Sequence, residues 1–318
     1  MRKSSIAFWC GAAAFLAMVF LLTRTIGNEY PFFAGYVILQ FIVLAVAWSI
    51  LGGYAGYVNF GTNAFFGVGV YTAVLLLKAF AAPLLVQIVA AALAGSLLGL
   101  GVGLLTLRMR GIFFSIATIA LAIIIETSVM NWRYVGGAAG IQLQRPPVMP
   151  LFDSYVKMLF FVQAMLAVVV IATTRAIQNS RIGRGLQALR DDELAAECTG
   201  VPTLRLKLLA CVISGALISA GGAPAALYLQ YANPESAFNL NYSVSVLAMS
   251  LIGGTAHWIG PVLGAILLGV TQQLLAVTIS SEVNVLVLGI TLVVFVVAAP
   301  KGILGLLELL PLRRRSRP

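Results

Sequence analysis

The sequence predicts an all-α, polytopic membrane protein with about 8–10 transmembrane helices, some of them interrupted by glycine. Hydrophobic residues make up 61% of the 318 residues and charged residues only 9%, against about 25% charged in soluble domains. The apolar residues form long continuous runs, and about 20 such residues cross a bilayer as a helix. A transmembrane β-barrel would instead show alternating segments of about ten residues. No polar linker divides the runs, so residues 1–318 are expected to form a single transmembrane domain.

Ten apolar runs are candidate spans: 5–23, 32–51, 58–80, 83–106, 111–130, 155–174, 208–229, 243–256, 260–279 and 283–299. The run at 243–256 is too short for a straight, full span. The first run follows Arg2 and Lys3, as the apolar part of a signal peptide would. It continues to Leu22 without a small-x-small cleavage pattern, so we expect a retained helix.

The basic residues predict the orientation of the chain. Segments 1–4, 107–110, 175–207 and 300–318 hold 15 of the 20 Lys and Arg residues, and cytoplasmic segments are enriched in these residues. This distribution predicts cytoplasmic termini, a cytoplasmic loop at 175–207 and a basic cytoplasmic tail at 300–318. Topology and contact of the tail with membrane lipid account for the net charge of +10, so no nucleic-acid partner is expected.

The residue patterns of common catalytic and metal sites are missing from the sequence. His257 is the only histidine, and no His, Cys and carboxylate cluster has metal-ligand spacing. The sequence contains neither a G-x-S-x-G nucleophile motif nor a G-x-x-x-x-G-K-[ST] phosphate loop. We therefore expect no catalytic residue, no metal site and no cofactor. The three cysteines imply no disulfide framework.

Two glycine-rich stretches predict interrupted helices. Residues 52–72 combine six glycines with polar side chains, and such groups inside a membrane must find partners. A broken helix there would expose free N–H groups to a polar solute, so we expect four residues to line a substrate path: Asn59, Gly61, Thr62 and Asn63. The alternative is close helix packing through small residues.

The second stretch lies in the other half of the chain. Gly253 and Gly254 end one short apolar run, and Gly260–Pro261 begins the next. Interrupted segments in both halves suggest an internal repeat around a central path, which Gly253 and Gly254 would line. Glu126 is the clearest intramembrane charge, and it would either line the same path or reach the membrane surface.

Gly95, Gly99 and Gly103 stand four residues apart on one helix face. This spacing predicts a ridge for close helix packing rather than a functional site. Pro224 should kink the run at 208–229.

Four blocks together resemble the signature sequences of LivM-type permeases, one of the two membrane subunits of branched-chain amino-acid ABC importers. The blocks are "GYAGYVNFGTNAFFGVGVYT", "LRMRGIFFSIATIALA", "GRGLQALRDDELAAECTGV" and "LIGGTAHWIGPVLGAILLG". The resemblance covers roughly residues 35 to 305. It implies a type II-like permease in a bacterial inner membrane that passes a small polar solute by ATP-driven alternating access. The implied partners are a LivH-like permease subunit, two ABC ATPase subunits and an extracytoplasmic solute-binding protein.

The chain departs from the family pattern near the expected path. Asn59, Thr62 and Asn63 replace the usual Ser, His or Gln, and Ala, and Val135 replaces a Thr. The solute therefore stays open between branched-chain or related amino acids and the urea, amides or aromatic acids that relatives carry. A self-contained channel or secondary carrier, and a scaffold without a path, are alternatives of a different class.

The segment 183–210 carries eight charged residues, an unusual density for this chain. "LAAECTG" at 194–200 resembles the E-A-A-x-x-x-G motif of ABC permeases, with Leu194 in place of the first Glu. Carboxylates at the start of the predicted helix suit its N-terminus, and Gly200 with Pro202 would end it. The predicted ATPase-coupling residues are Gly183, Arg184, Arg190, Asp191, Asp192, Glu193, Ala195, Ala196, Glu197 and Gly200.

Ala195 and Ala196 are expected to form a small face that an ATPase can approach closely. The alternative is a solvated loop that only satisfies the basic-residue bias of the cytoplasmic side. That bias requires Lys and Arg alone, whereas this segment adds four acidic residues. The acidic residues therefore favour contact with a protein.

Overall fold

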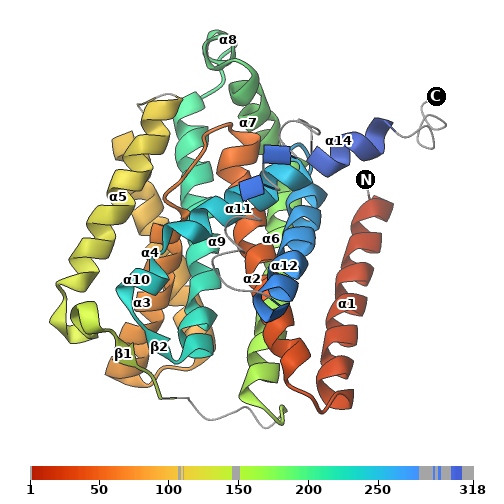
Figure 1. Cartoon of the computed structure of the whole chain (residues 1–318). Coiled ribbons are helices and arrows are strands. Elements are labelled where there is room, and N and C mark those ends of the chain that lie inside the picture. Colours follow the sequence, from red (N-terminus) through yellow and green to blue (C-terminus); the bar gives the residue numbers. More distant parts are fainter. Residues whose placement is uncertain are drawn as a thin grey trace.

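The computed structural model describes residues 2–106, 109, 111–144, 151–278, 289–290, 293–294 and 302–309. Among these residues, seven helices are long and apolar enough to cross a membrane, and they stand side by side in Figure 1. They are α1 (Arg2–Thr25), α2 (Tyr30–Ser49), α3 (Thr62–Phe80), α4 (Leu84–Thr106), α5 (Ile112–Met130), α6 (Tyr155–Gln178) and α9 (Thr203–Leu229). The predicted all-α, polytopic fold is confirmed.

The other two predicted spans within the described part of the chain are shorter in apolar length. α11 (Leu240–Gly253) has 14 residues, too few to cross a bilayer. α12 (Ile259–Thr278) is 20 residues long and apolar over Ile259–Leu275. The predicted run at 283–299 lies almost entirely outside the described residues.

The centre of the bundle is formed by α2 and α9. Residues Tyr36 to Trp48 of α2 include Val43 and Leu44, both without solvent exposure. α4 packs on α9 through glycine, because a Cβ on Gly95 would lie 2.4 Å from the Gly215 carbonyl oxygen. A Cβ on Gly99 would lie 2.8 Å from the Cys211 carbonyl oxygen. The predicted packing ridge on this helix is therefore confirmed at both positions.

The short elements gather at the two ends of the bundle. At the lower end in Figure 1, η2 (Arg133–Val135), η3 (Gly137–Ala139) and β1 (Ile141–Gln142) follow α5. β1 pairs antiparallel with β2 (Tyr231–Ala232), which follows α9. At the upper end, α7 (Arg181–Asp191) and α8 (Glu193–Cys198) project beyond the bundle.

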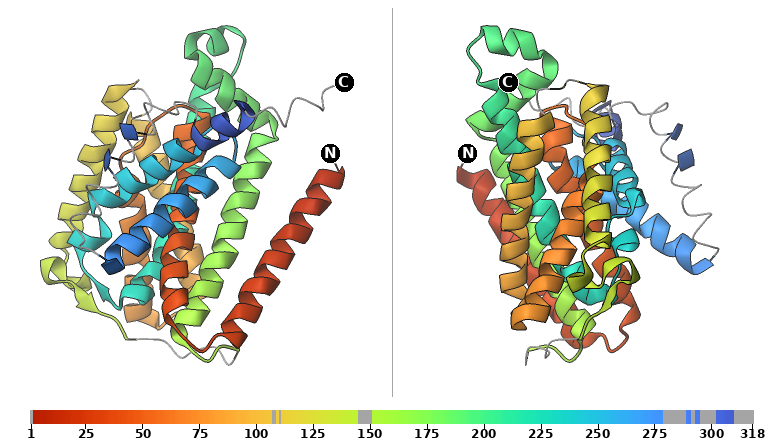
Figure 2. Two further views of the ribbon diagram at one scale, coloured as in Figure 1. Left: turned by 45° about the vertical axis from the view of Figure 1, so that its right-hand side comes forward. Right: turned by 90° about the vertical axis from the view of Figure 1, so that its left-hand side faces the viewer.

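The N-terminus of α1 and helix α14 (Gly302–Leu309) lie toward the same end as α7 and α8 (Figures 1 and 2). The described residues of three segments that the basic-residue bias assigns to one side of the membrane, 2–4, 175–207 and 302–309, thus lie toward one end of the bundle. Residues 131–144 lie at the opposite end (Figure 1). Which end faces the cytoplasm stays a prediction.

Two segments of the bundle are interrupted, as the glycine-rich stretches predict. α2 continues as a π-helical turn, η1 (Ile50–Tyr54), and residues 55–61 then run without helix before α3 begins. In the second half, α11 ends at Gly253 and α12 begins at Ile259, so this break lies inside the predicted stretch at 251–269. β2 and the short helix α10 (Pro234–Ala237) form a further break before α11 that the glycine pattern did not predict. Both α10 and the beginning of α3 lie inside the height of the bundle in Figure 1. Pro224 is accommodated inside α9, which runs unbroken to Leu229, so the predicted kink does not end the helix.

Candidate functional site

Two helix starts are joined inside the bundle. The backbone N–H of Asn63, in the first turn of α3, donates to Ser243 Oγ in α11 at 2.9 Å. Ser243 Oγ donates in turn to Asn63 Oδ1 at 3.1 Å, and Asn63 Nδ2 donates to the Phe238 carbonyl oxygen. The first N–H groups of a helix have no partner within the helix, so a side chain from the other half of the chain satisfies one of them. The bond connects positions 180 residues apart.

A cavity of about 220 Å³ lies against this junction, between α3, α5, α10 and α11. Its polar lining residues are Asn63, Glu126, Glu235 and Asn239, and the others are apolar. The structure therefore brings together Asn63 and Glu126, which the sequence places 63 positions apart. Glu235 adds a second carboxylate that sequence reasoning missed, because the four-residue helix that carries it has no apolar periodicity to reveal it.

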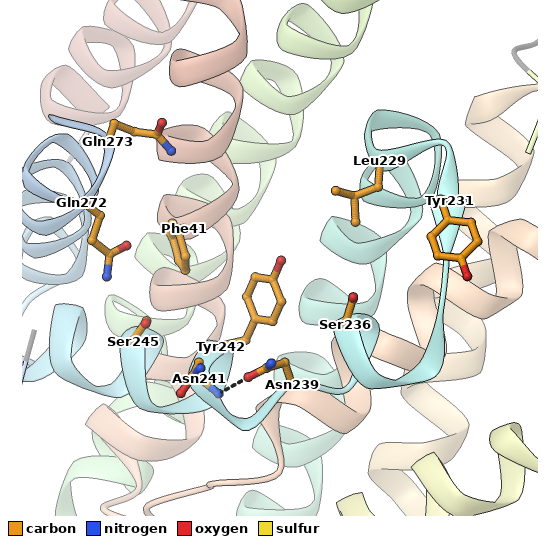
Figure 3. Close-up of a pocket in the computed structure, with 10 residues that line it drawn as sticks. All are labelled: Phe41, Leu229, Tyr231, Ser236, Asn239, Asn241, Tyr242, Ser245, Gln272 and Gln273. Atoms are coloured by element: carbon orange, nitrogen blue, oxygen red, sulfur yellow. Dashed lines mark hydrogen bonds between the residues drawn. The ribbon is translucent and has the colours of Figure 1, made fainter. Parts of the chain in front are cut away.

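A larger polar groove of about 580 Å³ lies beside the same junction and is drawn in Figure 3. It is bounded by α2, the end of α9, β2, α10, α11 and α12. Eight of its ten lining residues carry polar groups: Tyr231, Ser236, Asn239, Asn241, Tyr242, Ser245, Gln272 and Gln273. Phe41 and Leu229 complete the lining. Asn239 borders both this groove and the smaller cavity, so the two spaces are adjacent.

The groove is open on one side of the chain. Tyr231 is 48% exposed, and Asn241 is also exposed. Figure 3 shows Gln272 and Gln273 on α12, facing the opening that Tyr242 borders from α11. Amide side chains both donate and accept hydrogen bonds. Amide, hydroxyl and phenol groups from α10, α11, α12 and the segments beside them therefore line one groove in a chain with 9% charged residues.

The three other predicted path residues near α3 brace the interruption itself. Asn59 Oδ1 accepts from the Gly61 N–H at 2.8 Å, and the Asn59 carbonyl oxygen accepts from Trp48 Nε1 at 2.8 Å and Thr62 Oγ1 at 3.3 Å. Asn59 and Thr62 are almost fully buried. At Gly61, a Cβ would lie 2.8 Å from the Thr118 carbonyl oxygen. Contact of these residues with a solute stays a prediction, and in this conformation their polar groups bond within the chain.

The predicted coupling segment consists of two helices rather than one, with a break at Asp192. Ser180 caps α7 by accepting from the Gly183 N–H at 3.3 Å. Asp192 caps α8 by accepting from the N–H groups of Leu194 and Ala195 at 2.9 and 3.1 Å. Gly200, with φ of +83°, follows α8 in the left-handed conformation that glycine adopts without strain. Its predicted role in ending the helix is confirmed.

The projecting surface of this segment is formed by exposed residues of α7 and α8: Arg184, Asp191, Leu194, Ala195 and Glu197. Arg184 and Gly200 also line a groove of about 490 Å³ between α7 and the start of α9. The prediction that both alanines form an outward face is wrong for Ala196, which is 4% exposed. The break at Asp192 orients α8 so that Ala195 faces outward and Ala196 faces the chain itself.

Residues 30–296 match the family described as "branched-chain amino acid transport system / permease component". The chain belongs to this permease family. The high-affinity branched-chain amino acid transport system permease proteins LivM of Salmonella typhimurium and Escherichia coli are each 27% identical to it over 289 residues. These alignments cover 83% of this chain and 67% of each relative. The predicted resemblance to LivM-type permeases is confirmed.

The LivH permease protein of Escherichia coli is also similar to this permease. It is 24% identical over 285 residues, which cover 83% of this chain and 91% of LivH. A solved inward-facing ABC transporter aligns with a TM-score of 0.44 and 15% identity, over 95% of this chain and 98% of that one.

Gly253 and Gly254 of the permease line neither of the two polar spaces. A Cβ on Gly253 would lie 1.8 Å from the Gly260 carbonyl oxygen, and one on Gly260 would lie 1.7 Å from the Gly254 carbonyl oxygen. Gly254 has a φ of +96°. These glycines therefore allow the backbones at the end of α11 and the start of α12 to touch, and packing explains them without a substrate path.

Sequence reasoning missed the groove residues on α11 and α12. The signals were present as "NLNYSVS" at 239–245 and "TQQ" at 271–273, polar groups within or beside apolar runs. Such groups are equally expected where helices bond to each other inside a membrane. Their position on an open face of the permease distinguishes residues that line the groove from residues that only bond one helix to another.

Proposed function

We propose that the chain is the permease subunit of an ABC importer that passes a branched-chain or related amino acid across a bacterial inner membrane. Family membership is the observation that carries this proposal. The polar groove supports it, because the donors and acceptors of its amides suit both charged ends of an amino acid. Phe41, Leu229 and Tyr242 supply apolar surface beside those amides, as an aliphatic side chain requires.

A second permease subunit would complete the groove. The lining is exposed on one side, so a single chain does not enclose a solute. A LivH-like subunit is the partner that we propose, seated against α11 and α12. Transport would follow alternating access, in which the two subunits open the groove to one side of the membrane at a time.

The two ends of the bundle would contact the remaining partners. We propose that two ABC ATPase subunits dock at the cytoplasmic end, where α7 and α8 project, and that a solute-binding protein docks at the end that holds η2 and η3. Both termini would then face the cytoplasm, in agreement with the distribution of Lys and Arg. ATP hydrolysis would occur on the partner subunits.

The proposal is tested by uptake into proteoliposomes that contain the full complex and its binding protein. Leucine, phenylalanine, urea and a short amide would be compared as solutes. Uptake of leucine that requires ATP is the expected result, and ATP-dependent uptake of another solute alone would move the assignment to that class. Uptake without ATP would instead favour the channel or carrier.

Variants in the groove test its role. Gln272→Ala and Tyr242→Phe should each lower uptake at normal membrane abundance. Thr271→Ala is the matched control, because its hydroxyl bonds to the Leu267 carbonyl oxygen within α12 and does not line the groove. Normal uptake in both groove variants would show that the solute does not pass through this groove.

A further inference from the structure

Two charged residues of the predicted docking segment bond inward, to the interrupted part of the bundle. Glu193, the first residue of α8, accepts a hydrogen bond at 2.7 Å from the hydroxyl of Tyr57. The other carboxylate oxygen of Glu193 pairs with Lys207 of α9. The Lys207 ammonium lies 4.7 Å from the centroid of the Tyr57 ring. Tyr57 therefore meets α8 and the start of α9 at one carboxylate that lies 136 positions away in the sequence.

Arg190, near the end of α7, makes a second inward contact. Its Nη1 donates to the Gly53 carbonyl oxygen at 3.1 Å, within the π-helical turn η1. Its side-chain stem fills the space beside Gly56, where a Cβ would lie 2.8 Å from Arg190 Cγ. Gly56 has a φ of +76°, so glycine is favoured there by conformation as well as by space.

The contact between Glu193 and Lys207 resists separation because both charges are largely removed from water. The side chain of Lys207 is 3% exposed and that of Glu193 is 16% exposed. Removal of one partner from such a pair leaves the other charge without compensation in a poorly solvated place. α8, the start of α9 and Tyr57 should consequently move together rather than slide past one another.

The contacted segment leads directly to the junction at Asn63. Only five residues separate Tyr57 from Asn63, and bonds to α5 hold the chain between them. Ser115 Oγ donates to the Val58 carbonyl oxygen at 2.8 Å, and the Phe60 N–H donates to Thr118 Oγ1 at 3.2 Å. A displacement of Tyr57 therefore reaches the start of α3 through a short, braced length of chain.

We propose that Arg190 and Glu193 are positioning residues that transmit movement of α8 to residues 53–63 and so to the polar groove. This inference rests on the proposed function, since it assigns the transmission step of that importer. It also refines the expectation from the sequence, where both residues belong to the ATPase-coupling segment without a separate role. Docking is left to the residues of α7 and α8 that make no inward bond, and these two connect the docked surface with the interrupted helices.

The test uses the full complex with its ATPase subunits and the variants Glu193→Gln and Arg190→Gln. Both should keep the ATPase subunits and the basal ATP hydrolysis of the wild type, whereas solute-stimulated hydrolysis should fall about fivefold or more, the range of allosteric coupling energies. Arg205→Gln is the matched control. It removes an exposed charge two positions from Lys207 and should leave stimulation unchanged.

Hydrogen–deuterium exchange distinguishes transmission of movement from a purely structural role of the two residues. In the wild type, trapping with ATP and vanadate should change exchange at both α7–α8 and residues 53–63. Each variant should keep the change at α7–α8 and lose most of the change at 53–63. Arg190→Gln alters a partly exposed side chain, so it keeps the test decisive if Glu193→Gln does not fold.

The outcomes separate this inference from the proposed function. A full exchange response at 53–63 in both variants, with normal stimulation, would overturn the transmission role and leave the importer assignment intact. Loss of the ATPase subunits from the variants would show that Arg190 and Glu193 serve in docking. That result would also overturn the transmission role. A wild-type chain that retains no ATPase subunits would overturn both proposals.

Discussion

Replacement of Asn63 by Ala should weaken the junction between the two halves of the bundle. The change removes the donor to the Phe238 carbonyl oxygen and the acceptor for Ser243 Oγ. Phe238 is 1% exposed and Ser243 is fully buried, so both groups lose their partner in a poorly solvated place. An unsatisfied buried acceptor costs about 1–3 kcal/mol, and one ordinary hydrogen bond contributes about 1 kcal/mol. The free energy of unfolding should fall by about 2–4 kcal/mol.

Reversible unfolding in mixed detergent micelles measures this loss, and proteoliposome uptake is measured in parallel. Asn241→Ala is the matched control, because Asn241 is exposed and lines the groove. It should change stability by less than about 0.5 kcal/mol and still lower uptake. An Asn63→Ala variant as stable as the wild type would refute the bracing role. Equal loss of stability in both variants would refute the distinction between junction and groove.

Three further predictions concern packing, docking and topology. Gly95→Ala should destabilise the chain by about 1–3 kcal/mol through overpacking of α4 on α9. Gly101→Ala, which has open space around its Cβ, should instead stabilise the chain by up to about 1 kcal/mol. Thermal unfolding in detergent compares the stability of the two variants. Gly200→Trp should reduce co-purification of the ATPase subunits more than Gly200→Ala does. Both variants carry the same backbone strain, and only Trp obstructs the groove between α7 and the start of α9. In a cysteine-free background, an impermeant thiol reagent should label Ala138→Cys in intact cells and Leu194→Cys only after permeabilisation; label on Leu194→Cys in intact cells would invert the topology.

The sequence by itself determined the fold class and some of the places where helices stop. A chain with so few charges must place most of its surface in lipid, and helices satisfy their backbone groups there without a partner. Local chemistry also predicted the interruption before Thr62 and the end of α8 at Gly200. These features depend on local properties, namely the conformational freedom of glycine and the length of apolar runs. Both can be read from the order of residues along the chain.

Only the tertiary structure decided what the polar residues do. Asn59 and Asn63 look alike in the sequence, yet the first braces the break and the second also borders a cavity. Glu193 and Glu197 lie on one short helix, yet only Glu193 bonds to Tyr57, in the non-helical segment between η1 and α3. The partner of a polar side chain inside a bundle comes from a helix distant in sequence, and periodicity along one helix carries no information about which face another helix will cover.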